Sequence, residues 1–125
     1  MAQSRPISRA AVLVVEDEAV LRLMAVDVVE DAGFEALEAA DADEAIAILE
    51  TRPDIRILFT DIRMPGSMDG LKLARAVKDR WPPVKIILTS GHCSEHDVDV
   101  GLDSLFFAKP YDIGKVGAAL RQLAH

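Results

Sequence analysis

The chain has 125 residues, a length that suits one domain with a substantial apolar core. Half of the residues are apolar, 28% are charged and the formal net charge is −7, which argues against a disordered chain and against surfaces for nucleic acid or anionic membranes. The single cysteine excludes an internal disulfide, and without a membrane-length apolar run or a secretory signal we expect a cytoplasmic domain.

The chain opens with a strand pattern followed by a helix pattern. Residues 1–10 are expected to form a flexible lead-in, and residues 11–125 are expected to form the domain. Residues 11–15 are apolar without a break, as in a strand covered on both faces. Residues 19–32 follow as a helix that Gly33 would end. The spacing predicts a buried stripe of Leu21, Met24, Ala25, Val28 and Ala32, opposite a polar arc of Arg22, Asp27, Glu30 and Asp31.

The middle of the chain repeats this alternation. Residues 34–39 are expected to form a short second strand. The sequence Asp41-Ala42-Asp43-Glu44 has the form of a capping box and opens a helix that extends to about residue 50. Residues 55–60 form the third predicted strand, which ends at Asp61.

The last third of the chain contains two more strands, expected over residues 85–89 and 105–108. A helix over residues 69–80 precedes them, and two prolines stop it. A final helix over residues 112–123 is expected to turn Ile113, Val116, Leu120 and Leu123 inward. Because residues 92–104 have no helical stripe, we expect a short or irregular fourth helix there. Strands that alternate with helices in this way indicate a doubly wound α/β fold with a five-stranded parallel sheet.

Polar residues follow the apolar strands at their carboxyl ends. Glu16 and Asp17 follow the first strand, Asp61 the third, Ser90 the fourth and Lys109 the fifth. The carboxyl ends of parallel strands share one edge of the sheet, where such folds bind ligands. Three neighbouring carboxylates require a compensating cation, and Mg²⁺ prefers such oxygen ligands.

This arrangement suits phosphoryl transfer. An aspartate can attack a phosphoryl group and form an acyl phosphate, while a metal ion and a lysine neutralise its oxygens. Each residue taken alone has an ordinary explanation: the acidic pair as a helix cap, Asp61 as a turn residue, Ser90 as a loop residue and Lys109 as a solvated lysine. Their coincidence at four strand ends favours a site.

Four stretches of the sequence together resemble the response-regulator receiver domains of two-component signalling. The resemblance covers residues 11–123, and it implies a flavodoxin-like sheet of order 2-1-3-4-5 with helices on both faces. It extends to stand-alone alphaproteobacterial receivers, which are often linked to HWE-type histidine kinases. The stretches are Val12-Leu13-Val14-Val15-Glu16-Asp17-Glu18, the turn from Asp61 to Gly70, Leu88-Thr89-Ser90-Gly91 and Phe106-Phe107-Ala108-Lys109-Pro110.

The resemblance implies a role for each strand-end residue. Asp61 would be the phosphoacceptor. Glu16, Asp17 and Asp61 would hold Mg²⁺, together with the backbone carbonyl of Arg63. Ser90 and Lys109 would bind oxygens of the phosphoryl group.

The resemblance also assigns supporting residues. Pro110 matches a cis proline next to Lys109, and Phe106 matches the aromatic switch residue. Arg63 and His92 stand two positions beyond Asp61 and Ser90, where we expect their side chains to tune the lifetime of the phosphoryl group.

The resemblance implies a phosphoacceptor signalling domain, not an enzyme, whose donor is a sensor histidine kinase or a histidine phosphotransfer protein. Its output would be a protein–protein contact with a downstream protein or a role as a phosphate relay or sink. One alternative is a pseudo-receiver that binds partners without phosphorylation. A second is an aspartate-nucleophile phosphatase, although Arg63 stands where such enzymes need a general-acid carboxylate. A flavodoxin-like cofactor binder would need a phosphate-binding loop after the first strand, where acidic residues stand instead.

Overall fold

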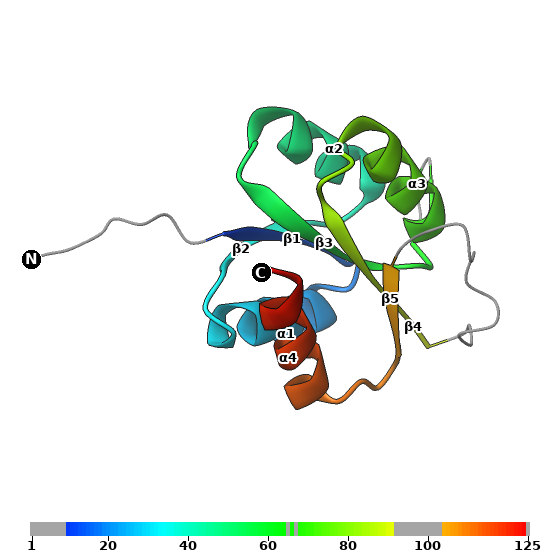
Figure 1. Ribbon diagram of the computed structural model, residues 1–125. Helices are drawn as coiled ribbons and strands as arrows, with labels where there is room; N and C mark the ends of the chain where they lie inside the picture. The colour runs from blue at the N-terminus through cyan, green and yellow to red at the C-terminus, as the bar shows by residue number, and fades with distance from the viewer. Residues whose placement is uncertain (1–9, 65, 67, 92–103, 125) are drawn as a thin grey trace, which may run out of the picture.

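The computed structural model describes residues 10–64, 66, 68–91 and 104–124 (Figure 1). Strands and helices alternate along most of this chain, as expected from the sequence. The elements are β1 (Ala11–Val15), α1 (Ala19–Asp31), β2 (Glu35–Ala39), α2 (Ala42–Thr51), β3 (Ile55–Asp61), α3 (Gly70–Arg80), β4 (Lys85–Ser90), β5 (Ser104–Ala108) and α4 (Ile113–Leu123).

The five strands form one parallel sheet in the order β2-β1-β3-β4-β5. This order confirms the predicted fold class. The register pairs Val15 with Thr60, Asp61 with Thr89, and Ser90 with Ala108. The ends of β1, β3, β4 and β5 therefore meet at one edge of the sheet.

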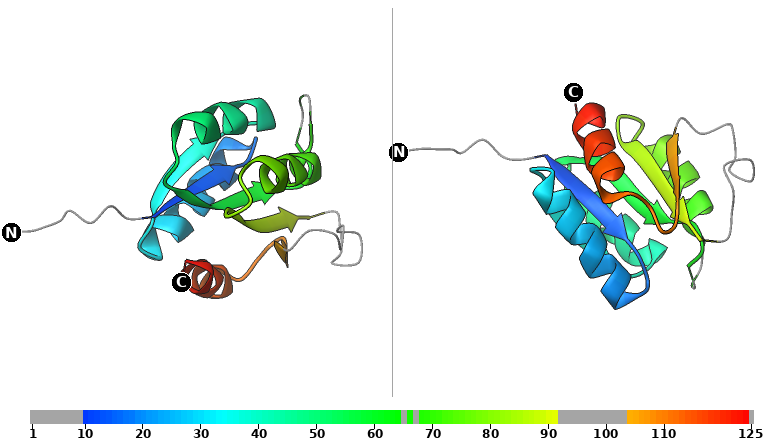
Figure 2. Two further views of the ribbon diagram at one scale, coloured as in Figure 1. Left: turned by 45° about the horizontal axis from the view of Figure 1, so that its top comes forward. Right: turned by 90° about the horizontal axis from the view of Figure 1, so that it is seen from below.

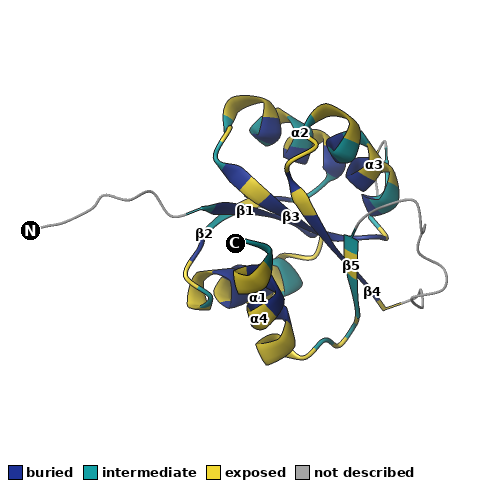
Figure 3. Ribbon diagram, viewed as in Figure 1, coloured by how far each residue is buried: buried dark blue, intermediate teal, exposed yellow. Residues whose placement is uncertain are grey.

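Within the described residues, α1 and α4 lie on one face of the sheet and α2 and α3 lie on the other (Figure 2). Alternate residues of β1 point to opposite faces, as the period of a strand requires. Val12 and Val14 belong to a core shared with α1 and α4, whereas Leu13 and Val15 belong to a core shared with α2 and α3. All five residues of β1 are buried, which explains its unbroken apolar sequence (Figure 3).

The helix ends carry the local signals that the sequence predicted. Gly33 follows α1 with a φ of 98°, a backbone conformation that favours glycine. The Glu44 N–H donates to the Asp41 side chain at 2.9 Å, as in a capping box. The Glu44 carboxylate, however, accepts from the backbone N–H of Ala40 at 2.6 Å, one residue earlier than the standard motif. Aspartates also cap α3 and α4 through their side chains.

Two predicted core positions are wrong. Met24 is 50% exposed and Ile113 is 57% exposed. The buried side of α1 consists of Ala25, Val26, Val28 and Val29, which lie in its second half. The reason is that the first turns of α1 and α4 line a cavity from opposite sides. Helical spacing places the apolar residues of these turns on the inner face, but a cavity lies there in place of packed side chains. Residues 1–9 of the lead-in expected over 1–10, and residues 92–103 of the irregular helix expected over 92–104, lie outside the described residues, and Ser104 begins β5.

Candidate functional site

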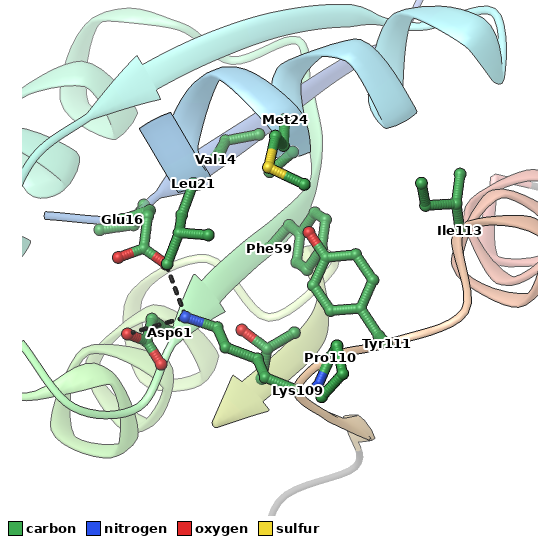
Figure 4. A pocket seen from close by; sticks show the side chains of 13 residues that line it. Val14, Glu16, Leu21, Met24, Phe59, Asp61, Lys109, Pro110, Tyr111 and Ile113 are labelled. Atoms are coloured by element: carbon green, nitrogen blue, oxygen red, sulfur yellow. Dashed lines mark hydrogen bonds and ion pairs between the residues drawn. The ribbon is translucent and has the colours of Figure 1, made fainter. Parts of the chain in front are cut away.

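The carboxylates that follow β1 and end β3 lie together at the edge of the sheet (Figure 4). Glu16 and Asp61 are buried, with 5% and 8% of their surface exposed, and Asp17 is exposed. Each of the three residues offers a carboxylate oxygen within 4.8 Å of the others. The structure thus brings together the three side chains that the sequence predicted as metal ligands.

Lys109 supplies the positive charge beside these carboxylates. Its Nζ lies 2.7 Å from Glu16 Oε1 and 3.3 Å from Asp61 Oδ2. The backbone holds Lys109 in place, because its N–H donates to the carbonyl of Ser90 at 2.9 Å. The peptide bond between Lys109 and Pro110 is cis, as the resemblance implies. The ammonium is therefore shared between Glu16, which follows β1, and Asp61, which ends β3.

Burial and charge act in opposite directions on these groups. Burial raises the pKa of Asp61 and of Glu16, and the nearby ammonium of Lys109 opposes that rise without cancelling it. Burial also acts to lower the pKa of Lys109, but its hydrogen bonds to Glu16 and Asp61 and the negative charges of both carboxylates together outweigh burial, so this pKa is raised. The site favours a proton or a cation among its carboxylates.

Arg22 fixes the loop that carries Glu16 and Asp17. Its Nη1 donates to the carbonyl of Glu16 at 2.9 Å, and its Nε lies 3.2 Å from Glu38 of β2. The loop is also closed by the Glu18 N–H, which donates to the Glu16 side chain at 3.2 Å. The sequence pattern placed Arg22 on the solvent-facing arc of α1, so it gave no signal of this role.

Gly70 allows the first turn of α3 to pack against the end of β3. Its N–H donates to the carbonyl of Ile62 at 2.7 Å. A Cβ at this position would lie 2.8 Å from the carbonyl carbon of Asp61 and 2.8 Å from the Cα of Ile62, and closer still to the Asp61 carbonyl oxygen. The backbone beside Asp61 therefore leaves no room for a side chain at residue 70. Gly70 belongs to the quoted motif, but sequence reasoning gave it no role.

The structure also places Ser90, Phe106 and Arg63. Ser90 is buried at the end of β4, where its carbonyl receives the Lys109 N–H. Phe106 is half-buried and packs against the core between the sheet and α2 and α3. Arg63 is exposed just beyond β3. His92 lies outside the described residues.

The comparisons with known proteins decide the family. The family model of the response regulator receiver domain matches residues 12–121. The chain belongs to this family. Its solved relatives include a response regulator receiver protein from Pseudomonas putida, with a TM-score of 0.83, 32% identity and coverage of 94% of this chain and 99% of that one. A receiver protein from Sinorhizobium medicae gives a TM-score of 0.85 at 29% identity, with coverage of 94% and 96%.

Curated relatives contain a receiver domain as one part of a longer protein. The transcriptional regulator NtrC of Salmonella typhimurium is 31% identical over 125 residues, which cover 94% of this chain and 25% of NtrC. The sensor kinase CckA of Brucella abortus is 29% identical over 118 residues, which cover 91% of this chain and 12% of CckA. The chain thus spans a quarter or less of the length of these relatives.

Receiver domains bind Mg²⁺ at an acidic pocket, and this receiver has an acidic group of that kind. Glu16, Asp17 and Asp61 offer carboxylate oxygens, the donors that a hard divalent cation prefers. Buried carboxylates with raised pKa values also gain from a bound cation. The residues present therefore fit the metal.

No helix within the described part of the chain combines the length and the hydropathy that a membrane span needs.

Proposed function

We propose that this receiver domain accepts a phosphoryl group on Asp61 in a Mg²⁺-dependent reaction. The observation that carries the proposal is the position of Asp61, a buried carboxylate within 4.8 Å of two further carboxylates and 3.3 Å from the Lys109 ammonium. A nucleophile among groups that bind a metal ion and neutralise phosphoryl oxygens is what phosphoryl transfer requires.

In the proposed reaction, an Asp61 carboxylate oxygen attacks the phosphorus of a phosphohistidine. The new P–O bond forms while the P–N bond breaks, and the imidazole leaves with the electron pair. Lys109 exchanges its contacts with Glu16 and Asp61 for the transferred oxygens, and Ser90 donates its hydroxyl to another. Bound Mg²⁺, held by Glu16, Asp17, Asp61 and the backbone carbonyl of Arg63, would neutralise charge on the phosphoryl group.

We propose a sensor histidine kinase or a histidine phosphotransfer protein as the donor, with residues 11–125 acting as the receiving unit in the cytoplasm. The family supports this choice, and the sensor kinase CckA shows that relatives occur next to kinase segments. The output would follow from repacking of Phe106 once Ser90 is drawn to the phosphoryl group, or from onward transfer of the phosphoryl group.

The direct test is the intact mass of the protein after it is mixed with Mg²⁺ and acetyl phosphate. We expect a gain of about 80 Da, one phosphoryl group, that requires Mg²⁺ and is absent in Asp61→Asn. If no adduct forms, a titration with beryllofluoride separates two outcomes. Binding of this phosphoryl mimic would indicate rapid dephosphorylation, whereas failure to bind it would favour a pseudo-receiver. Turnover of a generic phosphomonoester would favour the phosphatase alternative.

We also propose that Arg63 and His92 set the lifetime of the phosphoryl group, by crowding or positioning the water that attacks it. Arg63 is exposed two residues beyond Asp61, the last residue of β3, and this exposure leaves its side chain free of the core. Replacement of both residues by alanine is expected to change the rate of dephosphorylation, measured by loss of the mass adduct. An unchanged rate would contradict this assignment.

A further inference from the structure

A cavity of about 340 Å³ adjoins the phosphoacceptor (Figure 4). It lies between the first turns of α1, the end of β3 and the segment from Lys109 to Ile113. Its volume falls within the range of pockets that hold small organic molecules. The chemistry proposed for Asp61 leaves the apolar part of this cavity without a role.

The wall of the cavity is mostly apolar and partly aromatic. The rings of Phe59 and Tyr111 lie 5.9 Å apart at an angle of 54°, and Figure 4 shows the Met24 side chain next to them. Met24 and Ile113 are about half exposed, so the fold leaves apolar surface uncovered on both sides of the cavity. A flat apolar group would gain by covering a thioether and two rings.

One end of the cavity carries an excess of negative charge. Glu16 and Asp61 line it together with Lys109, which leaves one net negative charge, and Asp17 beside them adds a second. The Lys109 ammonium is already engaged by both carboxylates. An anionic ligand would therefore meet more negative than positive charge, whereas a cationic ligand would find complementary carboxylates.

The aromatic wall also favours a cation. The phenol of Tyr111 is neutral at physiological pH, because its ordinary pKa is near 10 and burial raises that pKa further, and the face of a neutral aromatic ring attracts a positive charge.

We propose that this cavity binds a small organic cation, an amine or amidine on an aromatic or branched apolar body. The apolar body lies against Met24, Phe59 and Tyr111, and the cationic group pairs with Glu16 and Asp61. Because these carboxylates are also the proposed Mg²⁺ ligands, the organic cation competes with Mg²⁺ and slows phosphorylation. Only this competition rests on the proposed function; the binding itself does not.

The binding test compares three probes of nearly equal shape: benzylammonium, neutral benzyl alcohol and anionic benzoate. Binding is measured by ¹H–¹⁵N NMR titration without Mg²⁺ at constant ionic strength. We expect benzylammonium to shift amide resonances around the cavity and to bind roughly tenfold more tightly than either other probe. Equal affinities for the three probes, or no binding of benzylammonium, would overturn the proposal.

A pair of variants on α1 locates the site. Met24→Lys places a positive charge in the cavity wall and is expected to weaken benzylammonium binding roughly tenfold. Leu23→Lys adds the same charge at a neighbouring position, 60% exposed and outside the cavity wall, and is expected to leave binding nearly unchanged. Both positions are exposed, so both variants should fold. Equal weakening by the two variants would contradict the assignment to the cavity.

The competition is tested by adding Mg²⁺ to the NMR titration and by adding benzylammonium to the acetyl phosphate reaction. We expect Mg²⁺ to weaken benzylammonium binding and the organic cation to slow the mass gain at limiting Mg²⁺. Phosphorylation at an unchanged rate with saturating benzylammonium would overturn the regulatory part. If the protein gains no mass even without benzylammonium, the beryllofluoride titration decides whether the proposed function fails, and the Mg²⁺-free NMR titration still decides whether the cavity binds cations.

Discussion

Arg22 supports the carboxylate site from outside it, through the loop that follows β1. It connects the backbone of the loop after β1 to Glu38 on β2, so it orients Glu16 without touching the position of a ligand. Its ion pair with Glu38 is partly exposed and contributes little on its own. The contact with the Glu16 carbonyl is the one that shapes the loop.

Arg22→Ala is therefore expected to weaken Mg²⁺ binding by up to roughly tenfold, because a support behind a metal ligand is lost. The Mg²⁺ dissociation constant from calorimetry is the deciding quantity. Glu38→Gln is the matched control, since it removes the ion pair and keeps the carbonyl contact, and it should change Mg²⁺ affinity much less. A loss of thermal stability in Arg22→Ala at unchanged Mg²⁺ affinity would assign Arg22 a purely structural role.

The raised pKa values of Glu16 and Asp61 predict how Mg²⁺ binding depends on pH. Mg²⁺ binds the deprotonated carboxylates, so protons compete with the metal. As the pH falls through a raised pKa, protonation begins earlier than at an ordinary carboxylate, and the Mg²⁺ affinity declines. Calorimetric titrations between about pH 7 and pH 5 should show this decline. A constant affinity over that range would indicate ordinary carboxyl pKa values.

At the scale of elements, the junction of β3 and α3 depends on the absence of a side chain at Gly70. Gly70→Ala is expected to lower the free energy of unfolding by about 2 kcal/mol or more, because a Cβ would press on the backbone of Asp61 and Ile62. The same displacement should slow phosphorylation. Denaturant unfolding and the acetyl phosphate assay measure the two effects.

Gly117 in α4 provides the control for this substitution. A Cβ there would make only an ordinary contact, at 3.7 Å from Arg121 Nη1. Gly117→Ala is therefore expected to be neutral or slightly stabilising, since alanine favours a helix. A Gly70→Ala protein as stable as Gly117→Ala would show that the junction can shift without cost.

The sequence predicted the elements and the site through signals of short range. Apolar runs locate the strands. Because the carboxyl ends of parallel strands share one edge of the sheet, polar residues at those ends are expected to lie together, and Asp61 and Lys109 were found in this way. The exposure of Met24 and Ile113 depends on the cavity that lies between α1 and α4. Helical spacing within one segment carries no information on how that segment packs against another helix. The clamp of Arg22 and the crowding at Gly70 join elements distant in the sequence, so a single sequence gave them no signal.

At the scale of the whole molecule, the ionised carboxylate of Asp61 lowers the free energy of unfolding of the metal-free protein. The folded state raises the pKa of Asp61, so it binds a proton there more tightly than the unfolded chain does. Protonation therefore stabilises the metal-free protein as the pH falls. A neutral side chain at residue 61 should act in the same direction at neutral pH.

Asp61→Asn is accordingly expected to stabilise the Mg²⁺-free protein and to raise its Tm by a few degrees. Mg²⁺ should raise the Tm of the wild-type protein and have much less effect on the variant. Thermal unfolding followed by circular dichroism, with and without Mg²⁺, measures both. A variant less stable than the metal-free wild type would mean that the ion pair with Lys109 outweighs burial and repulsion.

The negative and positive charges of the site are attached to different parts of the sheet. Glu16 directly follows the interior strand β1 and Asp61 ends the interior strand β3, while Lys109 directly follows β5, an edge strand in which none of the five residues is buried. Local opening begins where few apolar contacts resist it. Fraying of β5 would move Lys109 away from Glu16 and Asp61 and would leave these two carboxylates without their neutralising charge. The Lys109 ammonium is thus the group of the site that local opening removes most easily. In a hydrogen-exchange experiment, the amides of β5 should exchange with solvent before those of β1 and β3.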